Sequence, residues 1–226
     1  MNKLLLATFL ATSLLLESHA APPTVPPSAH EFIEWCDIWI SHANETNLPR
    51  VLLIGDSITR DYYPGVEKHL EGKAYVARLA TSRFASDPVL LQEIALVLDN
   101  TKFDIIHFNN GMHGWQHSEA EYREAFPKIL ATIQAHAPNA KLVWATTTPL
   151  KVSRPNSPTD PSDERIAARN AIGLACVKEQ NIPVDDLNAL VRGHPEFHSD
   201  NVHFNPQGIR LEAAQVAKSI EPLLAH

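Results

Sequence analysis

The chain reads Val51-Leu52-Leu53-Ile54-Gly55-Asp56-Ser57-Ile58-Thr59 in its first third. Consecutive branched apolar residues predict a strand that is buried on both faces, as in a parallel sheet. Gly55 ends this run and can adopt backbone angles that other residues avoid, so a tight turn is expected there. The turn presents Ser57 at the carboxyl end of the strand, where ligand crevices form in open α/β sheets. Ser57 is therefore a candidate nucleophile, and the alternative is that it only caps the following helix.

The carboxyl-terminal part of the chain supplies a matching acid and base. Asp200 precedes His203 by three residues in the stretch Asp200-Asn201-Val202-His203-Phe204-Asn205-Pro206. In a loop, the Asp200 carboxylate can fold back onto one ring nitrogen of His203, which leaves the other nitrogen free to accept a proton from a serine. A histidine held in this way suits general-base catalysis near neutral pH. We therefore predict that Ser57, His203 and Asp200 are the catalytic residues.

These two motifs, Gly-Asp-Ser-Ile at residues 55–58 and Asp-x-x-His-Phe at residues 200–204, resemble those of the SGNH (GDSL) hydrolase superfamily. The resemblance covers nearly the whole chain after the amino-terminal segment. It implies a flavodoxin-like fold and a serine ester hydrolase, with the Ser57 backbone N–H as one donor to the oxyanion. Neither a metal nor an organic cofactor is expected.

One predicted oxyanion loop departs from the superfamily pattern because residues 80–88 contain no glycine. Superfamily members usually have a glycine here, whose backbone N–H binds the oxyanion. The donor is a backbone amide, so Ala85 or Ser86 can supply it if the turn allows. The resemblance does not choose between the two.

The second departure lies in the loop at residues 109–115. Members generally carry Gly-x-Asn-Asp, whereas this chain has Gly111-Met112-His113-Gly114, so His113 stands in the place of the oxyanion-binding asparagine. A histidine N–H can also donate to an oxyanion. Asn110 is an alternative donor, and Asn109 is expected mainly to hold the loop.

Three residues beside these loops are candidates for substrate binding, namely Asp56, Arg83 and Trp115. Arg83 either contacts substrate or forms a surface ion pair, and the ion pair is the favoured interpretation. Trp115 at a crevice mouth can stack on a sugar ring, form an apolar wall or pack in the core.

Strands and helices alternate along the chain. Apolar runs predict four more strands, at residues 74–79, 103–108, 141–149 and 182–187. Apolar periodicity predicts helices at residues 28–40, 61–70, 89–98, 122–137, 166–178 and 207–224. This alternation predicts a three-layer α/β/α fold with a five-stranded parallel sheet. Residues 150–163, rich in Pro, Ser and Asp, are expected to form a specificity loop or a plain connection.

The amino terminus predicts export. Residues 1–20 have a lysine, a short apolar run and small residues before Ala21, as in a cleavable signal peptide. The apolar run is too short to span a bilayer, which disfavours an uncleaved membrane anchor. Residues 21–27 form a proline-rich spacer, and residues 28–226 are predicted to be a single hydrolase domain. The mature protein is therefore expected to be secreted or periplasmic.

The charge composition disfavours two classes of binding partner. The 226 residues carry a net charge of −7 without a basic run, so nucleic acid and anionic membranes are poor partners. Cys36 and Cys176 can form a disulfide in an exported protein or remain buried thiols. The sequence does not predict the oligomeric state.

Two rival interpretations have a basis in the sequence. The 12 histidines include the four-residue pairs His113/His117 and His194/His198, which is a zinc-ligand spacing on a helix. Gly114 and Pro195 lie inside these pairs and favour loops instead. The other rival is a carbohydrate-binding protein that has lost catalysis. The favoured prediction is a secreted esterase that acts on short acyl esters, such as O-acetyl groups on a small-molecule or polysaccharide carbohydrate, with lipid esters as an alternative.

Overall fold

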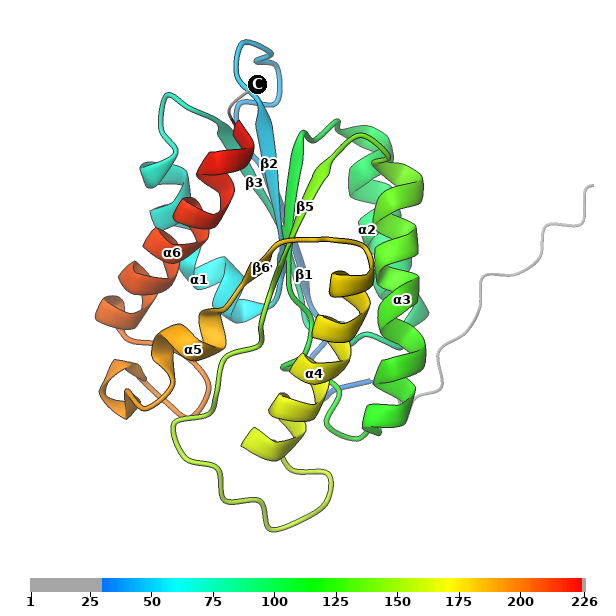
Figure 1. The fold of residues 1–226 in the computed structure, drawn as a ribbon, viewed down its shortest axis with the longest axis vertical. Helices are drawn as coiled ribbons and strands as arrows, with labels where there is room; N and C mark the ends of the chain where they lie inside the picture. Colours follow the sequence, from blue (N-terminus) through cyan, green and yellow to red (C-terminus); the bar gives the residue numbers. More distant parts are fainter. Residues whose placement is uncertain (1–29, 225–226) are drawn as a thin grey trace, which may run out of the picture.

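A computed structural model describes residues 30–224, which form a six-stranded sheet between two layers of helices (Figure 1). The strand order is β1-β3-β2-β4-β5-β6. The strands are β1 (Cys36–Ile40), β2 (Arg50–Gly55), β3 (Tyr75–Thr81), β4 (Ile105–Phe108), β5 (Lys141–Ala145) and β6 (Val184–Asp185). The helices are α1 (Ser57–His69), α2 (Pro88–Asn100), α3 (Glu119–His136), α4 (Asp163–Glu179), α5 (Leu187–Val191), the 3-10 turn η2 (Pro195–Phe197) and α6 (Pro206–Leu224).

The five strands predicted from apolar runs are all present and parallel to one another. Their order, with β2 between β3 and β4, is the flavodoxin-like order. The predicted α/β/α class is therefore confirmed. The sheet has six strands rather than five because β1 pairs with β3 in the antiparallel direction.

The helix predicted at residues 28–40 is wrong over its described part. Residues 36–40 form β1, an edge strand whose register runs from Cys36 opposite Thr81 to Ile40 opposite Ala77. The free edge of β3 offers backbone partners to this segment, and Ile38-Trp39-Ile40 is a β-branched and aromatic run that suits a strand. Spacing alone did not distinguish the two states. Trp39 on this strand is 54% exposed.

The two faces of the sheet are covered by different helices. Val51 and Leu53 of β2 join the core beneath α1 and α6, whereas Leu52 and Ile54 join the core beneath α2, α3 and α4. Figure 1 shows these helices on opposite sides of the sheet. The alternation follows from the two-residue period of a strand, and every residue of β2 is buried, as the apolar run predicts.

The topology places two loops side by side. β2 and β4 are neighbours, but α1 follows β2 on one face and α3 follows β4 on the other. Where connections leave adjacent parallel strands toward opposite faces, a crevice forms at the carboxyl ends. Ser57 follows β2 and residues 109–115 follow β4, so both belong to this crevice.

Gly55 is needed for space rather than for an unusual backbone angle. It is not among the described residues with positive φ, contrary to the expectation from sequence. A Cβ at Gly55 would lie 2.0 Å from Oγ1 of Thr59, inside the first turn of α1. The glycine therefore lets the helix start immediately after the strand. As a result α1 begins at Ser57, four residues before the start of the helix predicted at residues 61–70.

Other predictions concern the termini and the cysteines. The predicted signal peptide and spacer, residues 1–27, lie outside the described residues. Cys36 and Cys176 are free thiols, one on β1 and the other on α4. Among residues 30–224, no helix combines the length and apolar character that crossing a membrane requires.

Candidate active site

Ser57, His203 and Asp200 form a continuous hydrogen-bonded chain. Ser57 Oγ lies 2.8 Å from His203 Nε2, and His203 Nδ1 lies 2.8 Å from Asp200 Oδ2. Ser57 and His203 lie 146 residues apart in the sequence, whereas Asp200 and His203 lie three apart. The fold therefore brings the serine to the histidine, and one loop brings the aspartate to it. This is the geometry of a nucleophile with a general base and an orienting acid.

Ser57 does not cap the helix that follows. Asp56 is the N-cap of α1, since its Oδ1 accepts a hydrogen bond from the Ile58 N–H at 2.9 Å. Ser57 is the first helical residue, and its side chain is left to meet His203. The N–H groups of a first helical turn have no partner within the helix and favour negative charge. The predicted role of Asp56 in binding substrate stays a prediction, but its buried carboxylate already has this structural task.

Asp200 is held as an anion by its own loop. Its Oδ1 accepts from the backbone N–H groups of Val202 and His203, each at 2.7 Å. Desolvation opposes ionisation, but these two N–H groups and the His203 ring outweigh it and lower the pKa of Asp200 to about 2. The carboxylate is therefore charged at neutral pH and orients His203 with Nδ1 protonated.

Ala85 and Ser86 are the central residues of a tight turn. The Asp87 N–H closes this turn on the Phe84 carbonyl at 3.0 Å, so the turn's own hydrogen bond does not use the amides of Ala85 and Ser86. Both residues line a small cavity of about 10 Å³ together with His113. The absence of glycine in this loop thus leaves two backbone donors, and the structure does not choose between them.

Asn109 and Asn110 fasten the loop that follows β4. Asn109 Nδ2 donates to the Ala145 carbonyl at 2.7 Å, which fits its expected structural role. Asn110 Nδ2 donates to the Arg83 carbonyl at 2.9 Å, and the Asn110 carbonyl accepts from the Tyr122 hydroxyl. Since one N–H of the Asn110 amide ties the two predicted oxyanion loops together, only its second N–H is left for an oxyanion.

His113 is contacted by a residue that the sequence analysis missed. Glu31 places both carboxylate oxygens at 2.9 and 3.0 Å from His113 Nδ1, and one of them also accepts from the Gly114 N–H at 3.2 Å. Gly114 has φ of 72°, and a Cβ there would lie 2.5 Å from Phe84. Glycine is therefore required where the two predicted oxyanion loops meet. No local pattern relates Glu31 to His113, which lies 82 residues away.

Arg169 of α4 holds the same loop through its backbone carbonyls, and the sequence analysis did not identify this residue either. Its guanidinium, 2% exposed, donates to the carbonyls of Gly111, His113 and Gly114 at 2.9, 2.6 and 3.0 Å. Arginine suits this task because its planar fork carries several donors in fixed directions. A signal was present in the sequence, since Arg169 lies three residues from both Ile166 and Ile172 on the apolar face of α4.

Comparison with known proteins fits this geometry. Residues 53–211 match the model of the GDSL-like Lipase/Acylhydrolase family. The chain belongs to this family. The sequence-based recognition and the prediction of a serine ester hydrolase are thereby confirmed. No curated protein sequence matches the chain significantly.

Solved structures share the fold at low identity. A GDSL-like lipase from Bacteroides thetaiotaomicron is 17% identical, with 76% of this chain and 88% of that chain covered and a TM-score of 0.63. A carbohydrate esterase family 3 protein from Talaromyces cellulolyticus is 20% identical over 78% and 98%, with a TM-score of 0.62. A carbohydrate acetylesterase from Sinorhizobium meliloti is 12% identical over 77% and 99%, with a TM-score of 0.61.

Arg83 in this GDSL-like chain is the centre of an ion-pair cluster. Its guanidinium lies 3.0 Å from Asp87, 3.6 Å from Glu34 and 3.7 Å from Glu93. The ion-pair interpretation matches these contacts, although the side chain is only 16% exposed rather than on the open surface. The cluster joins the loop before α2 to the amino-terminal residues.

Trp115 has arginines against its ring. The guanidinium carbon of Arg169 lies 4.3 Å from the ring centroid and that of Arg165 lies 5.3 Å away. These cation–π contacts stabilise the end of the His113 loop. Because Trp115 is also packed against the core beneath α1 and α6, its contacts support the packing alternative, and sugar stacking stays a prediction.

The histidine pairs do not converge as zinc ligands would. His113 bonds to Glu31, whereas His117 Nδ1 bonds to Glu121 at 3.2 Å. His194 bonds to Glu196, and His198 Nε2 lies 3.2 Å from the Pro149 carbonyl. Each histidine of a pair thus has a different local partner.

Within residues 30–224, one group of three potential metal ligands comes together, namely His30, Glu34 and Asp87. The Arg83 guanidinium already lies at 3.2 Å from His30 and 3.0 Å from Asp87. A bound cation would have to displace this positive group, so the donor set fits an arginine cluster better than a metal centre.

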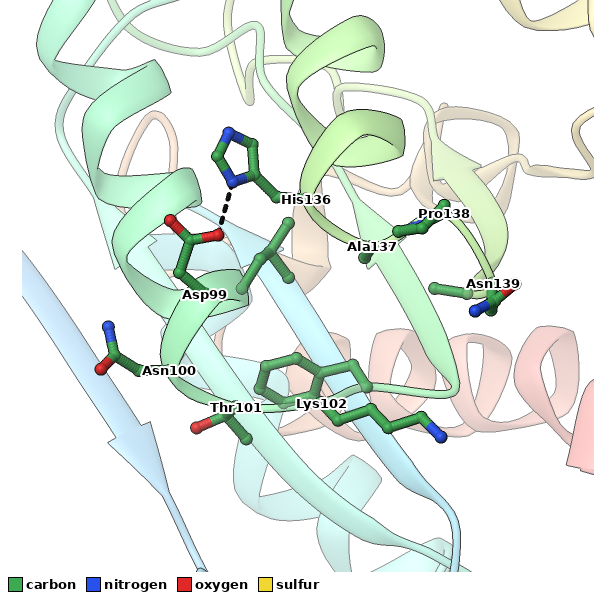
Figure 2. A pocket seen from close by; sticks show the side chains of 11 residues that line it. Asp99, Asn100, Thr101, Lys102, His136, Ala137, Pro138 and Asn139 are labelled. Carbon is green, nitrogen blue, oxygen red and sulfur yellow. Dashed lines mark hydrogen bonds and ion pairs between the residues drawn. The ribbon is translucent and has the colours of Figure 1, made fainter.

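A pocket of about 310 Å³ lies at the other end of the sheet, where α2 and α3 end and β4 and β5 begin (Figure 2). His136 Nδ1 contacts Asp99 at 2.6 Å on its rim. Ligand crevices of open α/β sheets form at the carboxyl ends of the strands. The substrate is therefore expected beside Ser57 and not in this pocket.

Proposed function

We propose that this protein is an exported serine esterase that removes short acyl groups, most of all O-acetyl groups, from carbohydrates. The observation that carries the proposal is the chain of two hydrogen bonds, each 2.8 Å, from Ser57 Oγ through the His203 ring to Asp200. The nucleophile has its base in place and the base has its orienting carboxylate. The arrangement needs no metal or organic cofactor.

The proposed reaction has two steps. Ser57 Oγ attacks the ester carbonyl carbon while its proton passes to His203 Nε2, and Asp200 stabilises the imidazolium that results. The alcohol then leaves with that proton, so an acyl group remains on Ser57. Water attacks the acyl carbon in the same way, with His203 again taking and returning a proton, and releases the carboxylic acid.

Three sources of N–H groups are proposed for the tetrahedral oxyanion. The first is the Ser57 amide at the start of α1, where the helix also favours negative charge. The second is the amide of Ala85 or Ser86 in the neighbouring turn. The third is the side chain of His113 or of Asn110. Such donors act on charge that develops in the transition state.

The substrate proposal rests on the size of the cavities near Ser57 and on the solved structures that this chain resembles. Two cavities next to the crevice loops, lined in part by Ala85 and His113 or by Asp56 and Asn109, hold about 10 Å³ each. The cavities of about 670 and 310 Å³ among the described residues lie toward the amino ends of the strands. A cavity of about 200 Å³ also adjoins Ala85 and Ser86, but residues of α2 and α3 line most of the rest of it and Ser57 does not line it. A long acyl chain thus gains little buried contact next to Ser57. The similar structures include a carbohydrate acetylesterase.

Export is proposed from the sequence of residues 1–20, and carbohydrate esters outside the cytoplasm then become the natural substrates. The same proposal has the mature chain free of a stable membrane anchor and without nucleic acid as a partner. Lipid esters are the alternative substrate class within the same mechanism.

Hydrolysis of p-nitrophenyl acetate, butyrate and octanoate by the purified protein tests the acyl preference. We expect kcat/KM to fall by at least about tenfold from acetate to octanoate, since the cavities of about 10 Å³ beside the crevice loops cannot hold the longer chain, which then displaces the ester from its position at Ser57. Activity should be unchanged by EDTA, and acetylated xylo-oligosaccharides should release acetate. A rise in kcat/KM with chain length would favour the lipid-ester alternative, and hydrolysis that EDTA abolishes would contradict the metal-independent mechanism.

A further inference from the structure

Residues 30–35, named here the amino-terminal strap, cross both oxyanion loops. Glu34 Oε2 accepts from the Ser82 hydroxyl at 2.6 Å, and the Trp35 N–H donates to Ser82 Oγ at 2.9 Å, so the strap is fixed to the loop before α2. Glu31 then reaches the other loop through His113 and Gly114. A segment that follows the predicted spacer therefore lies against the predicted oxyanion hole.

The contact between Glu31 and His113 fixes where the ring carries its proton. Both carboxylate oxygens lie within 3.0 Å of Nδ1, and an ionised carboxylate only accepts hydrogen bonds. Nδ1 must therefore carry a hydrogen. A neutral ring with its hydrogen on Nδ1 has only a lone pair on Nε2, which would repel an oxyanion. Nε2 can donate to an oxyanion only when the ring is an imidazolium.

We propose that Glu31 is a positioning residue that holds His113 as an imidazolium, so that the Nε2–H of His113 donates to the oxyanion of the tetrahedral intermediate. The inference rests on the proposed function of Ser57. It replaces the neutral amide donor of the family pattern by a charged donor, and it makes the amino-terminal strap part of the catalytic arrangement.

Charged groups facing His113 come from three elements: Glu31 and Glu34 of the strap, Asp56 of the turn before α1, and Arg169 of α4, which binds the His113 carbonyl. Burial disfavours the charged ring, but the hydrogen bond to Glu31 and the surrounding carboxylates outweigh burial and raise the pKa of His113. Desolvation also opposes the charge on Glu31, yet the hydrogen bonds from His113 and Gly114 lower its pKa. Both shifts favour an ion pair.

The His113 ring also packs against the amino-terminal strap and is partly shielded from water. The ring of Trp35 meets that of His113 edge-on with centroids 6.4 Å apart, and the Arg60 guanidinium lies 4.9 Å from the Trp35 ring. The His113 side chain is 19% exposed and Glu31 is 27% exposed, so their pairing is partly shielded from water. Partial burial strengthens such a pair relative to an exposed one.

The ion pair between Glu31 and His113 predicts how activity depends on pH. Activity should fall at high pH as His113 loses its proton, which gives the pH profile a falling limb. In Glu31→Gln the carboxylate is lost, so the falling limb should move to lower pH by about one unit or more, because an adjacent opposite charge shifts a pKa by roughly that amount. Below that limb kcat should drop by about tenfold as the ring is less well held.

The test measures kcat for p-nitrophenyl acetate against pH in the wild type, Glu31→Gln, His113→Asn, His113→Ala and the double variant Glu31→Gln/His113→Asn. His113→Ala should lose about 100-fold in kcat, as when one oxyanion donor is removed. His113→Asn should recover most of that loss and show no falling limb, because an amide does not titrate. Glu31→Gln should have no further effect on the pH profile in the His113→Asn background. Glu71→Gln, an exposed change after α1, is the matched control.

An unmoved falling limb in Glu31→Gln, or a falling limb that persists in His113→Asn, would overturn the inference. Failure of the proposed function looks different, because Ser57→Ala would then keep its activity. Imidazole ¹⁵N NMR of the histidines, compared between wild type and Glu31→Gln, reads the His113 titration without any turnover. If the His113 signal titrates at the same pH in both proteins, Glu31 does not hold the imidazolium.

Discussion

Ser57→Ala is expected to lower kcat/KM for p-nitrophenyl acetate by at least about 10⁴-fold. Removal of the nucleophile in serine hydrolases abolishes the covalent step, and only the stabilisation by the oxyanion hole and by binding survives. In this protein the Ser57 hydroxyl lies 2.8 Å from His203 Nε2. The loss should appear in kcat rather than in KM, because the change leaves the loops that bind the ester in place.

The fold should survive Ser57→Ala. Asp56 keeps the N-cap of α1, and alanine is favourable at helical positions. Ser219→Ala, the same chemical change on α6 where Oγ donates to the Val216 carbonyl at 2.8 Å and also interacts with Asp185, is the matched control and should retain full activity. Thermal unfolding of both variants should fall close to that of the wild type. Retention of more than about a hundredth of the activity in Ser57→Ala would contradict the assignment.

Asp200→Asn is expected to lower kcat by about 10³- to 10⁴-fold through the wrong tautomer of His203. The two backbone N–H groups at 2.7 Å from Oδ1 require an acceptor, so the asparagine oxygen will occupy that position. Its NH₂ group then faces His203 Nδ1, which must accept. The ring proton moves to Nε2, the nitrogen that faces Ser57, and the base can no longer take the serine proton.

Asp61→Asn is the matched control for the loss of charge. Asp61 also interacts electrostatically with His203, but Asp200 is the hydrogen-bond partner of Nδ1. Asp61→Asn should therefore change kcat by only a few-fold. Because the Asp200 side chain is 59% exposed, the stability of Asp200→Asn should change little. Equal losses in the two variants would mean that general electrostatics, and not the tautomer, accounts for the effect.

Much of the fold could be predicted from the sequence because its central strands have a simple physical signature. A strand covered on both faces is mostly apolar, and residues 51–54 have this pattern throughout. Residues 105–108 have it except at His107, which is buried and lies 3.0 Å from Asp185. The hydrogen-bonded arrangement of Ser57, His203 and Asp200 was predictable for a related reason. Asp200 and His203 meet within one loop, and Ser57 follows directly from the buried strand β2.

The edge of the sheet could not be predicted in the same way. β1 is half exposed, so neither an apolar run nor strict alternation marks it. Its strand state depends on the free edge of β3, which lies about 40 residues further along the chain. The apolar residues of 32–40 fit a helical spacing equally well, and only tertiary pairing decides between the two.

The two predicted oxyanion loops follow β3 and β4 as expected, but their contacts could not be predicted. Family resemblance placed His113 opposite the expected asparagine, but nothing near residue 113 pointed to Glu31 as its partner. Gly114 illustrates the same limit, since its need for glycine comes from Phe84 in another loop. Arg169 is the exception, because a charged residue on the buried face of a helix is a signal that local reasoning can detect.

Covalent labelling of the active serine tests the central claim most directly. The purified protein is treated with a fluorophosphonate, and the adduct is located by intact mass and peptide mapping. We predict one adduct per chain on Ser57, none in Ser57→Ala, and much slower labelling in His203→Ala, where the base is missing. A protein that hydrolyses p-nitrophenyl acetate yet takes no label on Ser57, or takes it on another serine, would contradict the account.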